Sequence, residues 1–375
     1  MKKIPFLLLV PLAMLLLAAG LYIHNYVTFV HTPSALTDKE KRMIDTLFAA
    51  TKAQCVGRYM FEVPTSFENT QSEHFQLNDI RISSKRLYRP AFEQRIRLRE
   101  QELKNGRTVR KVDQPFLKQV YRLSENAVIF DRNENESVPG FGRILEGHLY
   151  VNGVAFYLTQ EITDYSDPRY IKERNFYLRE EVGRHADMAN DKPQKLAELQ
   201  DLMSRISGRK NDEIPTEAGT CIPDGFIHDG KGEPREDITF VYPHHSGFSL
   251  TVSTNTYLGD ERSMLERSHE IQPYLTKINA RTLRKRKTQI ANFVADEWLT
   301  SAPSESSPGE PSGQLLFNAI ANEKTVDFRH PIIDLTLSNN AQPLRAYSDA
   351  ELVEIWDRIL HSFRLRSGAF KQGKS

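Results

Sequence analysis

The chain has 375 residues, of which 39% are hydrophobic and 26% are charged. This length is too great for one ordinary hydrophobic core and indicates two globular domains. The formal net charge is only +1, which excludes the strongly basic surface of a nucleic-acid-binding protein, so we expect no nucleic-acid partner.

The N-terminus carries an uncharged apolar segment at residues 4–23, directly after Lys2 and Lys3. About 20 such residues suffice to cross the hydrocarbon core of a bilayer. Because flanking lysines stay on the cytoplasmic side, the rest of the chain is expected outside the cytoplasm. We therefore predict a signal anchor and spacer at residues 1–36. The alternative is a signal peptide cleaved near Ala18-Ala19-Gly20, which would leave a soluble exported protein.

The first predicted domain covers residues 37–207. It opens with a helix, because Thr37 and Glu40 form a capping box. Asn152-Gly153 predicts a type I′ turn that joins two strands in a hairpin. From periodicity we expect strands at residues 55–64, 78–87, 118–123, 127–131, 143–151 and 154–162, and helices at residues 91–104, 168–188 and 192–206.

A polar stretch at residues 207–220 leads to a second predicted domain at residues 216–367, with a tail at residues 368–375. Strands that follow one another directly, with helices between the groups, indicate an α+β fold in which each domain is a mostly antiparallel sheet covered by helices. In this domain we expect strands at residues 238–242, 248–255, 288–297, 314–321 and 332–337, a helix at residues 261–277, and a last helix capped by Ser348 and Glu351.

The two cysteines, Cys55 and Cys221, each open a similar phrase in which a nearby glycine precedes strand-forming residues. An exported chain meets oxidising conditions, so the two cysteines can form one disulfide. It would close a loop of well over a hundred residues and contribute about 4–5 kcal/mol of stability in the chain-entropy picture. The alternatives are two buried thiols that pack as small apolar residues, or a nucleophilic cysteine.

The charged and polar clusters carry no recognisable chemistry. Basic residues outnumber acidic ones between residues 81 and 122 and again at residues 284–287, which indicates a solvated face or contact with anionic headgroups or an acidic partner. Adjacent residues such as His244 and His245 point to opposite faces of a strand and make a poor metal site. No Gly-x-Ser-x-Gly nucleophile motif occurs. We therefore expect no catalytic residue, no metal and no cofactor.

The two cysteine phrases point to a family. The run from Cys55 to Tyr59 ahead of Val63-Pro64, the run from Gly219 to Ile227, and the later strand at residues 248–255 resemble the immunity proteins that protect bacteria from type VI secretion lipase effectors. The resemblance covers residues 37–365. It implies two domains that grip a secreted phospholipase and block its lid or active site. Many relatives carry a lipoprotein cysteine, which is replaced here by a plain apolar segment.

The resemblance also implies a location and a partner. The body would lie in the periplasm, held to the bacterial inner membrane by residues 4–23, and its partner would be the secreted lipase effector. Aromatic residues and arginine dominate protein interfaces. We therefore predict partner contacts at Arg86, Tyr88, Arg89, Phe92, Arg169, Tyr170, Phe176 and Tyr177. A membrane-anchored envelope scaffold and a periplasmic hydrolase are the alternative functions.

Overall fold

The computed structural model describes residues 33–68, 71–180, 190–257, 259–260, 262–303, 314–339 and 347–371. The predicted anchor at residues 4–23 lies outside these ranges. Within them, no helix is both long and apolar enough to span a bilayer.

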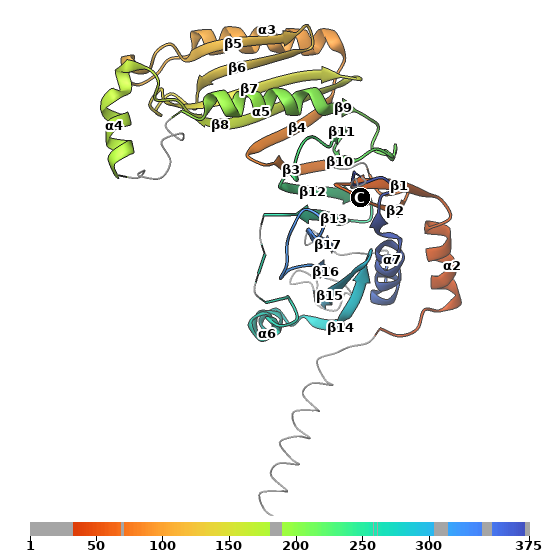
Figure 1. The fold of residues 1–375 in the computed structure, drawn as a ribbon. Coiled ribbons are helices and arrows are strands. Elements are labelled where there is room, and N and C mark those ends of the chain that lie inside the picture. Colours follow the sequence, from red (N-terminus) through yellow and green to blue (C-terminus); the bar gives the residue numbers. More distant parts are fainter. Residues whose placement is uncertain are drawn as a thin grey trace, which may run out of the picture.

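One sheet of twelve strands runs through the molecule (Figure 1). All of its neighbouring strands are antiparallel, and β3 and β12 join the strands of the first half to those of the second half. In spatial order the strands are β14 (Arg281–Ile290), β15 (Phe293–Ala302), β16 (Gln314–Ala321), β17 (Ile332–Asn339), β13 (Phe248–Asn255), β12 (Glu236–Pro243), β3 (Gln71–Leu77), β4 (Ile80–Arg86), β8 (Val154–Thr163), β7 (Gly142–Val151), β6 (Ala127–Asn133) and β5 (Leu117–Ser124).

Two small sheets lie where the halves meet. The first contains β1 (Thr51–Val56), β2 (Tyr59–Pro64) and β18 (Arg364–Leu365), so the start of the described chain pairs with its end. The second contains β10 (Gly219–Ile222), β11 (Gly225–His228) and β9 (Ile206–Gly208). Both of these sheets are also antiparallel.

Helices cover both faces of the large sheet. In the first half, α3 (Arg89–Asn105) packs on one face of β7 and α5 (Lys192–Arg205) on the other. In the second half, α7 (Asp349–Ser362) and α6 (Ser268–Lys277) pack near β14 and β15, and α2 (Asp38–Leu47) contacts α7. The short turns η2 (Lys111–Asp113) and η3 (Pro168–Tyr170) precede the projecting helix α4 (Ile171–Glu180). The predicted α+β class with mostly antiparallel sheet is confirmed.

Local sequence signals located several of these elements correctly. Thr37 and Ser348 cap α2 and α7 through the predicted capping boxes. Asn152 and Gly153, with φ of 51° and 77°, form the turn between β7 and β8. These features depend on neighbouring residues alone, so the sequence was sufficient to predict them.

Two predicted strands are in fact hairpins. Residues 55–64 reverse direction at Gly57, whose φ is 56°, and form β1 and β2. Residues 288–297 reverse at Ala291, whose φ is 51°, and divide between β14 and β15. In both cases apolar residues lie on the two sides of the turn, so the pattern of alternation continued through it and concealed the reversal.

Three further differences concern β3, α6 and α4. The strand β3 was not predicted, because Gln71–Leu77 is mostly polar, and Asn78, with φ of 50°, turns the chain from β3 into β4. The helix predicted at residues 261–277 forms only as α6, from Ser268. The predicted helix at residues 168–188 is η3 followed by α4, and its residues beyond Glu180 lie outside the described ranges.

The predicted disulfide is present between Cys55 of β1 and Cys221 of β10, whose Cα atoms are 5.8 Å apart. Beside it the two strands exchange backbone hydrogen bonds, from Gly57 N to Cys221 O at 3.1 Å and from Cys221 N to Gly57 O at 2.7 Å. The disulfide therefore connects the hairpin β1–β2 to the hairpin β10–β11, at the point where the two halves of the chain meet.

Three buried arginines surround this disulfide, and we call the disulfide and these arginines the junction. Arg58, Arg209 and Arg366 are only 3%, 7% and 2% exposed. Burial lowers the pKa of Arg209 and of Arg366 to about 10, so both remain charged at neutral pH. A buried charge is costly unless hydrogen bonds compensate it. The compensation here comes mainly from backbone carbonyl oxygens, because Arg366 donates to those of Pro215, Glu217 and Gly219, and Arg209 to those of Lys210, Asn211, Glu213 and Gly225.

Among the described residues, Arg58 is the junction arginine whose guanidinium pairs with carboxylates. Its guanidinium lies 2.8 Å from Asp229 and 2.7 Å from Glu236, and it also donates to the carbonyl oxygen of Ala369. These partners belong to three separate segments of the chain. Arg58 therefore ties the hairpin β1–β2 to β12, to the segment after β11 and to the C-terminal segment at once.

Replacing Gly57 by alanine tests how tightly the junction is packed. A Cβ there would lie 2.8 Å from Thr254 Oγ1 and would also carry a positive φ. The left-handed conformation costs about 1–2 kcal/mol, and overpacking adds about 1–3 kcal/mol. Gly153→Ala is the matched control, because its φ is also positive but nothing lies within 4 Å of the new Cβ. In urea unfolding, Gly57→Ala should lower the free energy of unfolding more than Gly153→Ala does. Equal decreases in the two variants would contradict tight packing at Gly57.

Removing the disulfide should destabilise the whole protein. The cysteines are separated by 166 residues, and a loop of that length contributes about 5 kcal/mol in the chain-entropy picture. We expect Cys55→Ala/Cys221→Ala to lower the free energy of unfolding by about that amount. Adding a reductant to the wild type should lower it similarly and should leave the double variant unchanged. A double variant as stable as the oxidised wild type would refute this role.

Candidate partner-binding surfaces

The predicted contact residues fall on two separate surfaces. Arg86 pairs with Val154 at the start of β8, whereas Arg169 follows shortly after Thr163 at the end of that strand. A ten-residue strand is about 30 Å long. The segments at residues 86–92 and 169–177 therefore lie at opposite ends of β8, in the upper half of the large sheet in Figure 1, and cannot form one continuous patch.

At the start of α3, one predicted aromatic residue is exposed and the other is buried. Tyr88 is 70% exposed, whereas Phe92 is 4% exposed and stacks on Tyr150. The structure thus removes Phe92 from the exposed surface, because α3 presents that side chain to the sheet. The two arginines are already paired, Arg86 with Asp224 at 3.0 Å and Arg89 with Glu93 and Glu125.

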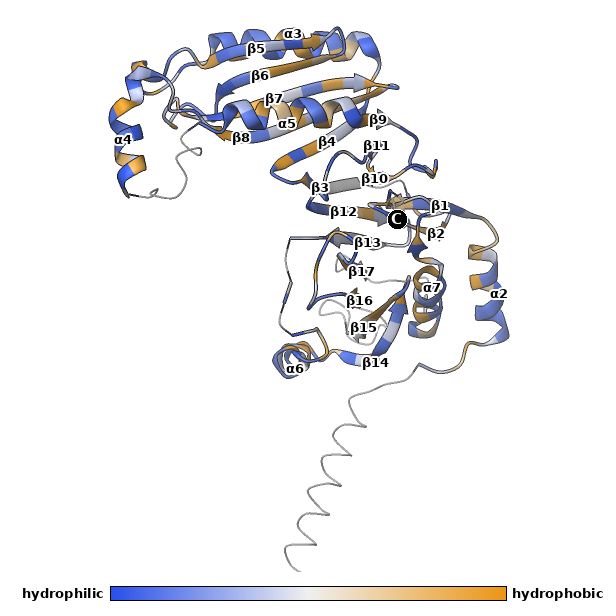
Figure 2. Ribbon diagram, in the orientation of Figure 1, coloured by the Kyte–Doolittle hydropathy of each residue, from blue (hydrophilic) through white to orange (hydrophobic). Residues whose placement is uncertain are grey.

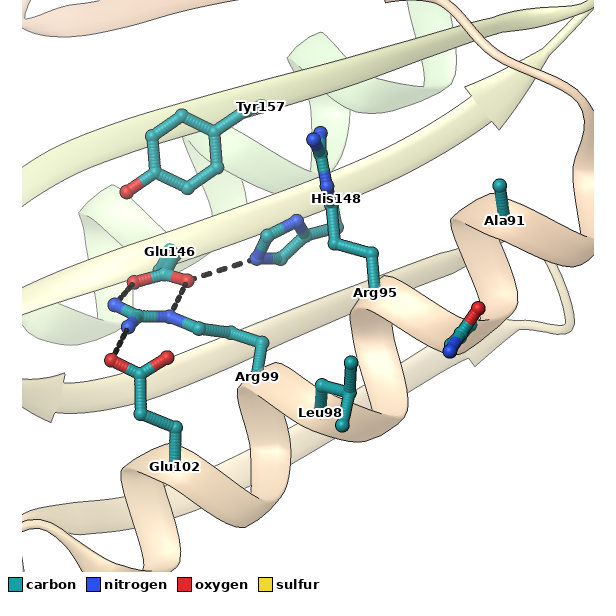
Figure 3. A pocket seen from close by; sticks show the side chains of 9 residues that line it. Ala91, Arg95, Leu98, Arg99, Glu102, Glu146, His148 and Tyr157 are labelled. Atoms are coloured by element: carbon teal, nitrogen blue, oxygen red, sulfur yellow. Dashed lines mark hydrogen bonds and ion pairs between the residues drawn. The ribbon is translucent and has the colours of Figure 1, made fainter.

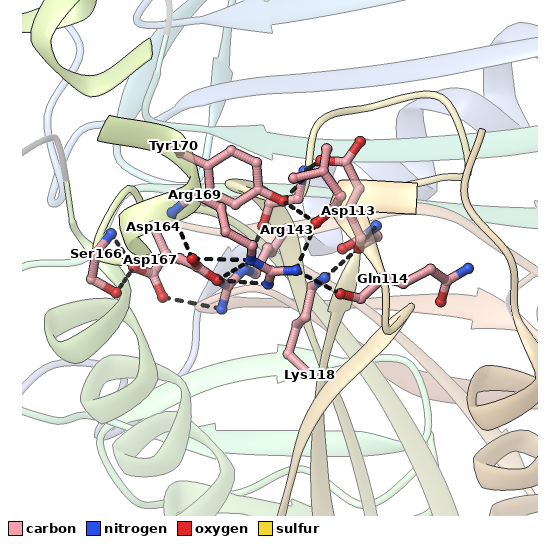
Figure 4. Close-up of polar contacts among 12 residues, drawn as sticks. Asp113, Gln114, Lys118, Arg143, Asp164, Ser166, Asp167, Arg169 and Tyr170 are labelled. Atoms are coloured by element: carbon pink, nitrogen blue, oxygen red, sulfur yellow. Dashed lines mark hydrogen bonds and ion pairs between the residues drawn. The ribbon is translucent and has the colours of Figure 1, made fainter. Parts of the chain in front are cut away.

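At the start of α4, Tyr170 is likewise buried. Its hydroxyl donates to the carboxylate of Asp113 at 2.8 Å, and its side chain is 1% exposed (Figure 4). Burial and the hydrogen bond with Asp113 raise the pKa of Tyr170 to about 12. Arg169 pairs with Asp167 at 2.6 Å and donates to the carbonyl oxygens of Val112 and Gln114. These two residues fix the base of α4 to η2, so Tyr170 acts as an internal contact.

Lys118 borders the same cluster (Figure 4). Burial, together with the positive charges of Arg143 and Arg169, lowers the pKa of Lys118 to about 8. Its ammonium donates to the carbonyl oxygen of Asp113 at 2.6 Å. The cluster is thus held together by internal hydrogen bonds, which indicates that its role is to position α4.

The body of α4 presents apolar side chains to solvent. Ile171 is 48% exposed and Phe176 is 61% exposed, whereas Tyr177 stacks on Tyr165. Figure 2 shows these hydrophobic positions interspersed with hydrophilic ones on a helix that projects from the end of the sheet. Of the aromatic residues predicted to contact a partner, Tyr88 and Phe176 are therefore the strongly exposed ones.

A cavity of about 630 Å³ lies between α3 and the sheet (Figure 3). Its floor is formed by side chains of β7 and β8, and its wall by α3. The lining residues are Ala91, Gln94, Arg95, Leu98, Arg99, Glu102, Glu146, His148 and Tyr157.

The floor of this cavity is organised around Glu146, which is completely buried. Its carboxylate accepts two hydrogen bonds from Arg99, both at 2.8 Å, one from Arg132, and one from His148 Nε2 at 2.9 Å. Burial by itself would raise the pKa of Glu146, but the hydrogen bonds from Arg99 and His148 and the charge of Arg132 outweigh it and hold the pKa well below its usual range. Arg99 also pairs with Glu102.

Sequence reasoning missed this cluster. Glu146 and His148 stand two residues apart in the largely buried strand Gly142–Val151, and a charged residue at such a position is the signal that could have drawn attention to it. The packing of α3 on the sheet brings Arg99 to Glu146, and the pairing of β6 with β7 brings Arg132 there, so the cluster depends on contacts between separate elements.

The described residues contain one serine–histidine pair of interest, Ser66 and His244, at 3.0 Å. His244 Nδ1 accepts the backbone N–H of Ser246 at 3.2 Å, so in the neutral ring the proton lies on Nε2. Nε2 then donates to Ser66 and cannot accept its proton. Burial also lowers the pKa of His244 to about 4. This arrangement is unsuited to activating Ser66 as a nucleophile.

The acidic and basic residues of β14 and β15, which could also have formed a functional site, are engaged in contacts within the protein. Glu297 accepts from Arg284, Arg286 and Trp356, and Lys285 lies over the ring of Trp298. Each residue of the basic run at residues 284–287 thus contacts an acidic or aromatic side chain of the protein itself. Among the described residues, no group of three or more histidine, cysteine, aspartate or glutamate side chains could hold a metal ion.

Replacing Glu146 by glutamine tests the cluster through pH. Because its pKa is depressed in the folded state, the ionised carboxylate stabilises the fold above about pH 4.5, and this stabilisation is lost as the pH falls further. We expect Glu146→Gln to lower the free energy of unfolding by about 3 kcal/mol near neutral pH.

In denaturant titrations, the difference between Glu146→Gln and the wild type should begin to shrink as the pH falls below about 4.5, where the carboxylate of the unfolded chain becomes protonated. It should keep shrinking as the pH falls further towards the depressed pKa of the folded state. Glu161→Gln is the control, because Glu161 forms an exposed ion pair with Arg81, and such pairs contribute less than about 1 kcal/mol. A difference for Glu146→Gln that is independent of pH would contradict the assignment.

Comparison with known proteins relates both halves of the chain to one family. Residues 52–209 match the Tle cognate immunity protein 4 N-terminal domain, and residues 213–368 match the Tle cognate immunity protein 4 C-terminal domain. No curated protein sequence matches the chain.

Solved structures at 18% sequence identity share the fold. The apo structure of TplEi, an immunity protein of the type VI secretion system from Pseudomonas aeruginosa, has a TM-score of 0.67 at 18% identity, covering 84% of this chain and 97% of that chain. The crystal structure of the Tle4–Tli4 complex has a TM-score of 0.66 at 18% identity, covering 85% of this chain and 98% of that chain. The structure of TplEi complexed with "L" peptide has a TM-score of 0.61 at 18% identity, covering 84% of this chain and 98% of that chain.

The family predicted from the cysteine phrases is thereby confirmed. The two domain models follow one another along the chain in the expected order, and they leave only the N-terminal region, three residues at 210–212 and the last residues unmatched. This protein therefore belongs to the Tle cognate immunity protein 4 family.

Proposed function

We propose that this chain is an immunity protein that binds a type VI secretion lipase effector in the periplasm and inhibits its phospholipase activity. The observation that supports this most directly is the match of both domain models, over residues 52–209 and 213–368. A chain of the Tle4–Tli4 complex shares the fold of this protein, which supports a function in binding a partner protein.

The junction suits a protein that acts by binding. A partner-binding surface built on rigid elements loses less conformational entropy when the complex forms. The proposed units at residues 37–207 and 216–367 are linked by the disulfide, by Arg58 and by the pairing of β3 with β12. A lipase that contacts both units would therefore meet surfaces whose relative positions are already set.

The exposed aromatic residues remain the proposed contacts of the lipase. Tyr88 and Phe176 lie near opposite ends of β8 and are strongly exposed. Arg86, Arg89, Arg169 and Tyr177 flank them, and their existing intramolecular contacts hold them in place. The proposal needs no catalytic group and no cofactor.

The apolar segment at residues 4–23 supports the proposed location, because it follows two lysines and is long enough to span a bilayer. The body would then lie in the periplasm, attached to the inner membrane. Cleavage after Ala18-Ala19-Gly20 is the alternative, and it would place the body in the same compartment.

The proposal predicts inhibition that can be measured directly. The full chain, purified from the envelope fraction, should bind the lipase encoded beside its gene and suppress release of fatty acid from phospholipid vesicles. Inhibition should saturate at a fixed ratio of the two proteins, because it results from formation of a complex. An unrelated secreted phospholipase serves as the control and should keep its activity.

A cellular comparison tests the compartment. Cells that lack the gene should be killed by siblings that deliver the lipase, and the full gene should restore survival. A version that begins after residue 36 should stay in the cytoplasm and give no protection, whereas the same version fused to an unrelated cleavable signal peptide should protect. If the purified chain neither binds nor inhibits the lipase, the proposed function is wrong.

A further inference from the structure

The charges that line the cavity beside α3 are only partly balanced by contacts within the protein. Its carboxylates are already neutralised, because Glu146 accepts from Arg99, Arg132 and His148, and Glu102 pairs with Arg99. Their negative charge is therefore balanced before any partner arrives.

Arg95 supplies a positive charge that is not balanced. It lines the cavity from α3, and no carboxylate of the described residues pairs with it. In Figure 3 its side chain extends from α3 away from the pair formed by Arg99 and Glu146. The free charge that the cavity offers to a ligand is therefore cationic.

Apolar surface lies directly beside this free cation. Leu98, one turn of α3 further on, is 57% exposed, and Tyr157 on the floor is 36% exposed. Both are large side chains that solvent reaches although they border a cavity of about 630 Å³. The cavity thus combines one unpaired guanidinium with an apolar wall, on a floor that is held rigid by buried hydrogen bonds.

We propose that this cavity receives a projecting segment of the lipase in which an aspartate or glutamate stands beside an apolar side chain. The carboxylate would pair with Arg95, and the apolar side chain would pack against Leu98 and Tyr157. The inference rests on the proposed function and adds to it a specific site and the chemistry of the segment that the site recognises. The surface is additional to Tyr88 and Phe176.

The shape of the site favours a protein segment over a membrane surface. The cavity is hollowed between a helix and a sheet, so a group must extend into it to reach both the floor and Arg95. A carboxylate on a side chain that projects from a protein has that reach, and its pairing with Arg95 adds to the packing of the neighbouring apolar side chain against Leu98 and Tyr157. Binding of anionic lipid is accordingly an outcome that the test must exclude.

The test compares two charge reversals on the same helix, Arg95→Glu and Arg97→Glu. Both are exposed and both change the net charge equally, but Arg97 does not line the cavity. Two residues turn an α-helix by about 200°, so Arg97 faces away from the site. Long-range attraction of a charged partner changes similarly in both variants, and only Arg95→Glu places a carboxylate inside the cavity.

Affinity for the lipase encoded beside the gene would be measured with the full chain by titration calorimetry or biolayer interferometry. We expect Arg95→Glu to weaken binding by at least about tenfold, which is about 1.4 kcal/mol. Arg97→Glu should stay within about twofold of the wild type, as is typical of a charge outside the contact. Leu98→Ala should weaken binding by a smaller factor, and all variants should keep the unfolding midpoint of the wild type.

Each outcome has a distinct meaning. If the wild type does not bind the lipase, the proposed function fails and this inference fails with it. If the wild type binds and Arg95→Glu has the same affinity as Arg97→Glu, the inference about the cavity is overturned, while the proposed function stands. Sedimentation with vesicles of phosphatidylcholine and phosphatidylglycerol provides the second readout, and wild-type binding that is lost only in Arg95→Glu would assign the cavity to lipid and overturn the inference.

Discussion

The arrangement of this molecule depends on the buried charge of Arg58. A guanidinium that is 3% exposed requires partners from every side, and it finds them in Asp229, Glu236 and the carbonyl oxygen of Ala369. Removing such partners leaves a buried charge uncompensated, at a cost of about 3–5 kcal/mol. The segments that provide them are therefore held around one point, and the disulfide between Cys55 and Cys221 closes the same point covalently.

The same physical arrangement recurs where helices meet the large sheet. Glu146 on β7 is bound by Arg99 of α3, and Glu297 on β15 is bound by Trp356 of α7 and by Arg284. In each case a completely buried carboxylate joins a helix to the strand below it. Apolar packing alone would allow a helix to slide along the sheet, whereas these directional contacts fix its position. A binding protein benefits, because its surface is ordered before the partner arrives.

The outcome at the predicted contact residues follows from the same packing. Tyr88, Phe92, Tyr170 and Phe176 look equivalent in the sequence, yet two are buried and two are strongly exposed. Phe92 stacks on Tyr150 because α3 presents that position to the sheet, and Tyr170 reaches Asp113 because η2 lies beside it. Both partners are remote in the sequence. The composition of a segment therefore indicated where partner contacts could occur, but not which side chains were available for them.

The sequence by itself determined features that depend on neighbouring residues. These were the capping boxes at Thr37 and Ser348, the turn at Asn152-Gly153, the α+β class and, through the two cysteine phrases, the family. Only the tertiary structure decided the reversal at Gly57, the polar strand β3 and the cluster around Glu146. The physical reason is that each of these is stabilised by residues distant in the chain: Cys221 pairs with Gly57, β12 pairs with β3, and Arg99 neutralises Glu146.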